Sequence, residues 1–137
     1  MENNILQTEL SNLLKDRFST AESTRANYAR GEDAYEAVLS QAVVFPENNM
    51  EVSKILQLCN KHKIPVVPFG TGTSLEGNAV GNENGITISL EKMNKVLSVN
   101  AVDFDCRVQA NVTRKQLNEH LRDDGVFFPI DPGADAA

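Results

Sequence analysis

Three glycines and three hydroxyl residues stand close together in the middle of the chain, directly after an apolar segment marked by prolines. They fall within eight positions of the stretch Pro65-Val-Val-Pro-Phe-Gly-Thr-Gly-Thr-Ser-Leu-Glu-Gly77. Glycines leave backbone N–H groups unshielded, and successive unshielded N–H groups form a concave site for anions. Because the hydroxyl groups add donors, the pattern suits a pyrophosphate held without a metal ion. By composition alone, an ordinary glycine-rich connection fits equally well.

Two common phosphate-binding patterns do not match this stretch. A Walker loop ends in Gly-Lys-Ser/Thr, whereas this stretch holds no lysine that could neutralise β- and γ-phosphates. A dinucleotide-binding fingerprint begins well at Gly70 and Gly72, but Leu75 occupies its third glycine position. A nucleoside triphosphatase and a Rossmann domain are therefore disfavoured.

No other group of reactive side chains has a spacing that indicates a catalytic or metal site. His62 and His120 fall inside helical patterns and are expected to face solvent. Cys59 and Cys106 lie 47 positions apart without a companion ligand, which predicts two reduced core thiols and neither a zinc site nor a disulfide. The acidic residues that could carry acid–base chemistry form no fixed pair and are expected on a solvated face: Glu32, Asp33, Asp103, Asp105, Asp123 and Asp124.

Size and charge limit the class of protein. The chain has 137 residues, of which 41% are hydrophobic, enough for the core of one globular domain. A net charge of -6 with scattered basic residues disfavours a nucleic-acid partner. No apolar run is long enough to span a membrane, and the acidic start resembles neither a signal peptide nor a transit peptide. These features predict a cytoplasmic protein.

The elements that must position the glycine loop can be read from the apolar pattern. Ile5, Leu6, Leu10, Leu13 and Leu14 predict an amphipathic helix near residues 4–17, whereas residues 19–40 are difficult to assign. A strand over 42–46 is followed by a helix capped by Asn48 or Asn49, with Val52, Ile55, Leu56 and Cys59 on its buried face. A second strand over 64–69 completes a parallel β-α-β unit with a right-handed crossover. The glycine loop leaves the end of that second strand.

The remaining pattern predicts three short strands and a helix. The strands are expected over 85–90, 96–99 and 106–112, and their succession suggests antiparallel pairing. Thr113 with Gln116 forms a capping box that opens a helix ending at Gly125. The fold class expected from these elements is α+β.

Four stretches, in the same order, resemble one family of proteins. They are the glycine loop and three others: Val43-Val-Phe-Pro46, Val112-Thr-Arg-Lys-Gln-Leu-Asn-Glu-His-Leu-Arg122 and Phe128-Pro-Ile-Asp-Pro-Gly-Ala-Asp135. Together they resemble the FAD-binding oxidoreductases typified by vanillyl-alcohol oxidase and p-cresol methylhydroxylase. Within that superfamily they look most like the D-lactate dehydrogenase and glycolate oxidase FAD-subunit branch. The resemblance spans about residues 40–137.

The resemblance implies which residues meet the cofactor. Backbone amides of the loop would bind the FAD pyrophosphate, at Phe69, Gly70, Thr71, Gly72, Thr73 and Ser74, while Leu75, Glu76 and Gly77 would pack at or beside it. Any side chain at Gly72 is expected to screen those amides. The segment Pro129 to Ala134 would run along the flavin, with contacts from Pro129, Asp131, Pro132 and Gly133. Asp131 precedes a proline, so capping a turn is an equal alternative for it.

The resemblance also implies a fold and an activity. The fold would be the first subdomain of the p-cresol methylhydroxylase-type FAD-binding fold, with residues 1–40 as a lead-in and 41–137 as a partial FAD-binding domain. The parent protein would oxidise a 2-hydroxy acid such as D-lactate or glycolate, using noncovalent FAD and an electron acceptor. Substrate would meet domains that this chain lacks, so the chain alone is expected to be inactive. The alternative is a structural or regulatory half-domain that binds no flavin.

Two details complete these expectations. Family members often show Pro-Gly where this chain has Ala110-Asn111, so Asn111 is expected to adopt a positive φ. Tyr28 and Tyr35 could approach a flavin, but we expect them to cover the core.

Overall fold

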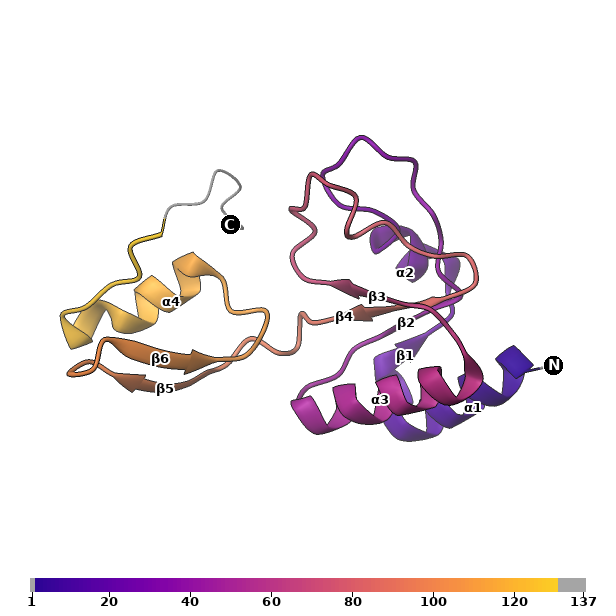
Figure 1. Cartoon of the computed structure of the whole chain (residues 1–137), viewed down its shortest axis with the longest axis horizontal. Helices are drawn as coiled ribbons and strands as arrows, with labels where there is room; N and C mark the ends of the chain where they lie inside the picture. Colours follow the sequence, from indigo (N-terminus) through magenta and orange to yellow (C-terminus); the bar gives the residue numbers. More distant parts are fainter. Residues whose placement is uncertain (1, 131–137) are drawn as a thin grey trace.

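The computed structural model of the chain describes residues 2–130, which form two lobes joined by one connection (Figure 1). The larger lobe is built on a four-stranded sheet and the smaller on a two-stranded sheet. The mixture of helices and strands agrees with the α+β class expected from the sequence.

The four-stranded sheet is parallel through its centre. Its strands are β1 (Phe18–Ser19), β2 (Ala42–Val44), β3 (Val66–Phe69) and β4 (Ile86–Ser89), in the order β1-β2-β4-β3. Strand β4 pairs in parallel with both β2 and β3, whereas β1 pairs antiparallel with β2. Antiparallel pairing of the strand predicted over 85–90 was therefore wrong. All four residues of β4 are buried. This is expected of a parallel strand that lies between two other strands and has both faces of the sheet covered.

A helix connects the first and last strands of the expected β-α-β unit. Helix α3 (Asn49–His62) begins after Asn48, whose side chain accepts a hydrogen bond from the Glu51 N–H, and ends at Lys63 in the left-handed region. Strands β2 and β3 are parallel, as predicted, although β4 lies between them. The C-terminal ends of β2, β3 and β4 therefore meet at one edge of the sheet.

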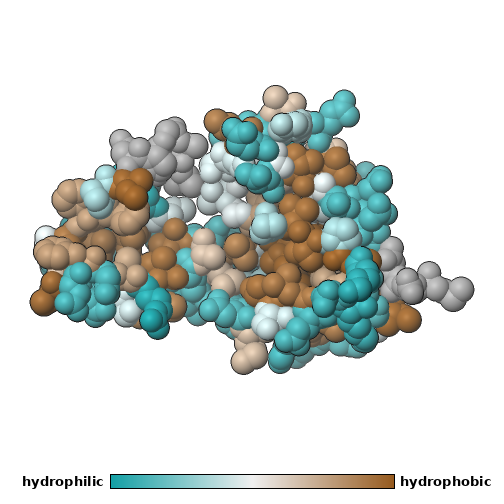
Figure 2. All heavy atoms as spheres, in the orientation of Figure 1, coloured by the Kyte–Doolittle hydropathy of each residue, from teal (hydrophilic) through white to brown (hydrophobic). Residues whose placement is uncertain are grey.

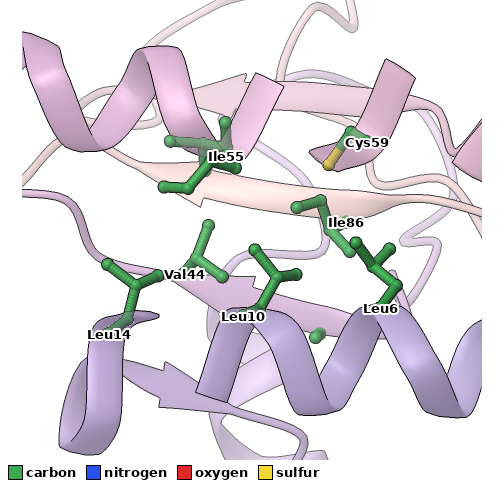
Figure 3. Packing of buried hydrophobic residues seen from close by; sticks show 9 residues of the cluster. Leu6, Leu10, Leu14, Val44, Ile55, Cys59 and Ile86 are labelled. Atoms are coloured by element: carbon green, nitrogen blue, oxygen red, sulfur yellow. The ribbon is translucent and has the colours of Figure 1, made fainter. Parts of the chain in front are cut away.

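Helices α1 (Glu2–Leu14) and α3 cover one face of the sheet and form the main core with it (Figure 3). Leu6, Leu10 and Leu14 stand one helical turn apart and are buried. Ile5 and Leu56 were expected in this core, but they are 55% and 46% exposed. The buried stripe of each helix is narrower than its apolar content suggests, because only positions facing the sheet are covered.

The region that the sequence left unassigned contains short elements and an irregular loop. A 3₁₀ helix (Lys15–Arg17) follows α1, and α2 (Glu22–Asn27) follows β1. Residues 28–41 then cross the upper side of the large lobe without regular structure, beside the glycine loop (Figure 1). These elements are too short for the periodicity of apolar residues to identify.

The smaller lobe consists of a hairpin and a helix. Strands β5 (Val96–Asn100) and β6 (Asp105–Val108) are antiparallel, as predicted, and α4 (Arg114–Leu121) runs into a 3₁₀ turn (Arg122–Asp124) that ends at Gly125. The Thr113 hydroxyl accepts from the Gln116 N–H. The second half of the predicted capping box is absent from the described residues, because the Gln116 side chain donates to the Asn94 carbonyl instead.

An ion pair fixes the start of α3 to the chain that precedes the sheet. The Arg17 guanidinium donates two hydrogen bonds to the Glu51 carboxylate, at 2.5 and 2.8 Å, and both side chains are about four-fifths buried. Glu51 also accepts from the Glu47 N–H. The Arg17 hydrogen bonds, followed by the Glu47 N–H, hold the pKa of Glu51 below its usual value of 4.5.

Glu51→Gln is expected to lower the free energy of unfolding at neutral pH by about 1–2 kcal/mol, because a charged, two-point contact is lost. The folded-state pKa of Glu51 lies below the unfolded one. This stabilisation is therefore present above the unfolded value and disappears as the pH falls through the folded one. Urea unfolding of the two proteins between neutral and acidic pH should show the gap closing below about pH 4. Glu47→Gln is the control, because its carboxylate is 52% exposed and 3.8 Å from Arg17. A gap independent of pH would contradict the assignment.

Candidate functional site

The glycine loop begins where β3 ends, at the edge where parallel strands finish. Ligands of open α/β sheets bind outside this edge, since loops and free backbone groups gather there. Phe69 is the last residue of β3 and is buried, and residues 70–77 form the loop that follows it. The sequence therefore placed the loop correctly relative to its strand.

Six consecutive backbone donors of this loop, the N–H groups of residues 70–75, find no acceptor within residues 2–130. Gly72 and Gly77 have φ angles of +77° and +74°, a region that favours glycine. The hydroxyl groups of Thr71 and Thr73 lie 3.4 Å apart, and Ser74 Oγ accepts from the Glu76 N–H. Such a run of unsatisfied donors fits the anion site expected from the composition.

A glycine outside the loop, Gly31, supports it, and the sequence did not single this residue out. Gly31 packs against it so closely that a Cβ atom there would stand 2.5 Å from the Gly72 carbonyl oxygen. The next residue, Glu32, donates its N–H to the same oxygen at 2.8 Å. The available signal was Arg30-Gly-Glu-Asp33, a turn-like stretch, but only the fold brings it to residue 72.

The acid next to this glycine is not solvated, so the expectation for Asp33 was wrong. Its carboxylate is 7% exposed and accepts from the N–H groups of Gly31 and Tyr35. An aspartate that accepts two nearby N–H groups fixes a turn, and its burial follows from that role. Tyr35 is 57% exposed and does not cover the core, contrary to expectation, although its ring lies against Gly77.

Tyr28 behaves as predicted and covers the core beside the loop. Its ring makes edge-on contacts with Phe45 and Phe69, at centroid distances of 5.5 and 5.1 Å. Its hydroxyl donates to the Glu91 carboxylate at 2.6 Å. Burial first, and then the Glu91 contact, raise the pKa of Tyr28 to about 12, so the hydroxyl stays protonated and keeps this hydrogen bond.

Asn111 lies close to the start of the loop, but its backbone differs from the expectation. Among the described residues with a side chain, only Lys15, Lys63 and Phe104 have a positive φ, so the prediction for Asn111 was wrong. Its side-chain oxygen would stand 3.6 Å from a Cβ atom on Gly70. This segment of the smaller lobe therefore borders the glycine loop.

The other predicted contact segment begins in the smaller lobe. Pro129 is exposed and lines an apolar cavity between the β5–β6 hairpin and residues 126–129. Figure 2 shows brown, apolar atoms over much of this lobe. Asn118 exchanges two hydrogen bonds with the Phe128 backbone and fixes the segment before Pro129. Asp131, Pro132 and Gly133 lie outside the described residues.

The histidines and cysteines form no site in the described residues. His120 is exposed, as expected, whereas the His62 side chain is only 12% exposed and contacts the Glu9 carboxylate at 2.7 Å. The expectation for His62 was wrong because α1 packs over that end of α3. Cys59 is buried and Cys106 half-buried, and both thiols are free. In residues 2–130 no three His, Cys, Asp or Glu side chains gather as a metal site would require.

Comparison with known proteins identifies the family. Residues 40–137 match the family model described as the FAD binding domain. The chain belongs to this FAD-binding domain family. The match includes the glycine loop.

Relatives of this FAD-binding domain are named as a D-lactate dehydrogenase and a glycolate oxidase subunit. The chain is 42% identical over 119 residues to a probable mitochondrial D-lactate dehydrogenase from Danio rerio, covering 87% of this chain and 24% of the relative. It is 29% identical over 119 residues to the glycolate oxidase subunit GlcD from Bacillus subtilis, covering 87% and 25%. The chain therefore spans about a quarter of the length of these relatives.

Solved structures confirm the fold. The 4-ethylphenol oxidase from Gulosibacter chungangensis superimposes with a TM-score of 0.84 at 25% identity, covering 99% of this chain and 27% of that one. A p-cresol methylhydroxylase superimposes with a TM-score of 0.79 at 23% identity, covering 90% and 25%. The expected p-cresol methylhydroxylase-type FAD-binding fold is thus confirmed as a partial domain.

No helix within residues 2–130 has the length and apolar character to cross a bilayer.

Proposed function

We propose that this chain is the FAD-binding part of an oxidoreductase that converts a 2-hydroxy acid, of the D-lactate or glycolate type, to the 2-oxo acid. The observation that carries the proposal is the row of N–H groups over residues 70–75 that find no acceptor within residues 2–130, in a member of the FAD-binding domain family. Bound FAD would accept the hydride of the substrate. The substrate class rests on the names of the relatives, which are D-lactate dehydrogenase and glycolate oxidase subunit.

The proposed cofactor contacts divide into two groups. Backbone amides of the loop would hold the pyrophosphate, with the neighbouring side chains at its border, from Phe69 to Gly77. The flavin would lie along Pro129, Asp131, Pro132 and Gly133. The loop donors would stabilise the phosphate charge, as a run of successive backbone N–H groups does for anions. Residues 41–137 would form the FAD-binding part, with residues 1–40 as its lead-in.

We propose that the cofactor is held without a covalent bond. The loop contains no histidine, and His62 lies on α3 in contact with Glu9, on the covered face of the sheet. Acid precipitation of the flavin-loaded protein should therefore leave the yellow colour in the supernatant. Colour that remains with the precipitated protein would contradict this.

Substrate binding, catalysis and electron transfer to an acceptor are assigned to the remainder of a longer protein. The relatives are about four times as long as the matched region, and we assign no catalytic residue in this chain. The chain alone is expected to show no turnover. A cytoplasmic location for this chain stays a prediction. The D. rerio relative is named as mitochondrial, which does not support it.

A titration of the 137-residue chain tests the proposal. FAD is expected to bind with quenching of its fluorescence, and at least about 100-fold more tightly than riboflavin, which lacks the pyrophosphate and the adenosine attached to it. Two hydrogen bonds to charged phosphate at about 1.5–3 kcal/mol each account for this difference. Binding of neither flavin would reject the proposal and favour a half-domain without flavin. Equal binding of both would show that the loop does not recognise phosphate.

A further inference from the structure

We propose that residues 28–35 act as a positioning segment, which holds the glycine loop in the shape that receives the pyrophosphate without touching the ligand. This inference rests on the proposed function of the loop. It assigns a role to a segment that lies outside the matched family region, which begins at residue 40.

One backbone hydrogen bond sets the orientation of the loop. The Glu32 N–H donates to the Gly72 carbonyl at 2.8 Å. Because the peptide unit is planar and trans, the carbonyl of Gly72 and the N–H of Thr73 point in opposite directions. Fixing the carbonyl toward residues 28–35 therefore turns the Thr73 N–H away from them, where it has no acceptor in the described chain.

Space at Gly31 makes this contact possible. A Cβ atom on residue 31 would stand 2.5 Å from the Gly72 oxygen and 3.1 Å from the Ser74 oxygen. Real Cβ atoms do not approach carbonyl oxygens to 2.5 Å, so any side chain would push the loop and the segment apart. Glycine is required here for close approach of two backbones and not for an unusual φ.

The segment is itself fixed on both sides of Gly31. The buried Asp33 carboxylate accepts from the N–H groups of Gly31, at 3.2 Å, and Tyr35, at 3.0 Å. Tyr28 contacts Phe69, whose ring lies beneath Gly72 at 2.9 Å from where a Cβ atom would stand. The loop is therefore held from the carbonyl side by Glu32 and from below by the Tyr28–Phe69 pair.

Gly31→Ala in the full chain tests the role of this contact. The variant is expected to bind FAD at least tenfold more weakly and to shift the amide NMR signals of Gly70, Gly72 and Gly77 without FAD. Gly85→Ala is the matched control. Its Cβ atom would stand 2.6 Å from the Pro65 carbonyl oxygen, at the opposite end of the sheet. Loss of stability without a change in FAD affinity is expected there, which separates loop positioning from general damage.

Asp33→Asn is a milder variant for the case in which Gly31→Ala does not fold. The asparagine side chain keeps one oxygen acceptor in place of the two carboxylate oxygens of Asp33. The FAD affinity of this variant is expected to fall about threefold, consistent with partial loss of one hydrogen bond. Wild-type FAD affinity and unshifted loop signals in the variant that folds would overturn the inference. If the unaltered chain binds no FAD, the proposed function fails instead. The glycine signals then decide the role of the segment alone: shifted signals support it and unshifted signals overturn it.

Discussion

Replacing Gly72 with valine is expected to abolish FAD binding, with an affinity loss of more than about 100-fold. The φ of +77° costs a residue with a side chain about 1–2 kcal/mol, and more when that side chain is β-branched. A Cβ atom would also stand 2.9 Å from the Phe69 ring. The side chain would thus point into the protein and force the loop to change shape, rather than screen the amides from outside as the sequence suggested. Loss of two charged hydrogen bonds corresponds to the stated loss of affinity.

A glycine with a similar backbone supplies the control for this variant. Gly125 has a φ of +70° at the end of the 3₁₀ turn after α4, and a Cβ atom there would meet nothing within 4 Å. Gly125→Val should carry a comparable backbone cost and keep FAD binding. The measurement is FAD fluorescence quenching, with circular dichroism to establish folding and Gly72→Ala as a milder variant. A folded Gly72→Val protein that binds FAD normally would refute the role given to this glycine.

Leu10→Ala is expected to have the largest effect on stability, about 3–4 kcal/mol. Leu10 is fully buried in the cluster where α1 and α3 meet the sheet, and its loss leaves a cavity that the helices cannot close (Figure 3). Domains of this kind are stable by only about 5–15 kcal/mol, so a large share would be lost. Urea denaturation measures the change.

Leu56→Ala removes the same atoms from an exposed position and is the matched control. Leu56 lies on α3 and is 46% exposed, so the expected change is about 0.5 kcal/mol or less. Similar losses in the two variants would mean that α1 does not pack as described. A small loss of stability in Leu10→Ala, whatever the result for Leu56→Ala, would also mean that α1 does not pack as described.

The elements near the loop were predictable because each carries a local signal. Asn48 caps α3, Thr113 caps α4, and the strand over 66–69 ends directly before the glycines. Caps and breaks depend on residues a few positions apart, so they can be read without knowing the fold. The irregular segment after α2 could not be assigned, because its structure depends on contacts with residues about forty positions away.

The sheet shows where local signals fail. Residues 86–89 alternate apolar and polar side chains, which favours a half-exposed antiparallel strand. In the fold they form the central parallel strand, and the polar Thr87 is buried with its hydroxyl 2.8 Å from that of Ser40. A hydrogen bond between residues 47 positions apart satisfies the buried hydroxyl, and no periodicity could have indicated it.

The sequence by itself determined the donor-rich loop, the strand before it and the family to which both belong, because these depend on residue types and short spacings. The tertiary structure alone decided what supports the loop. Gly31, Asp33 and Tyr28 have no distinctive spacing from residue 72. Gly31 and Tyr28 contact the loop region, and Asp33 fixes Gly31, because β4 inserts between β2 and β3 and the chain after α2 crosses the same sheet edge. Long-range packing sets such contacts, and a local pattern cannot encode them.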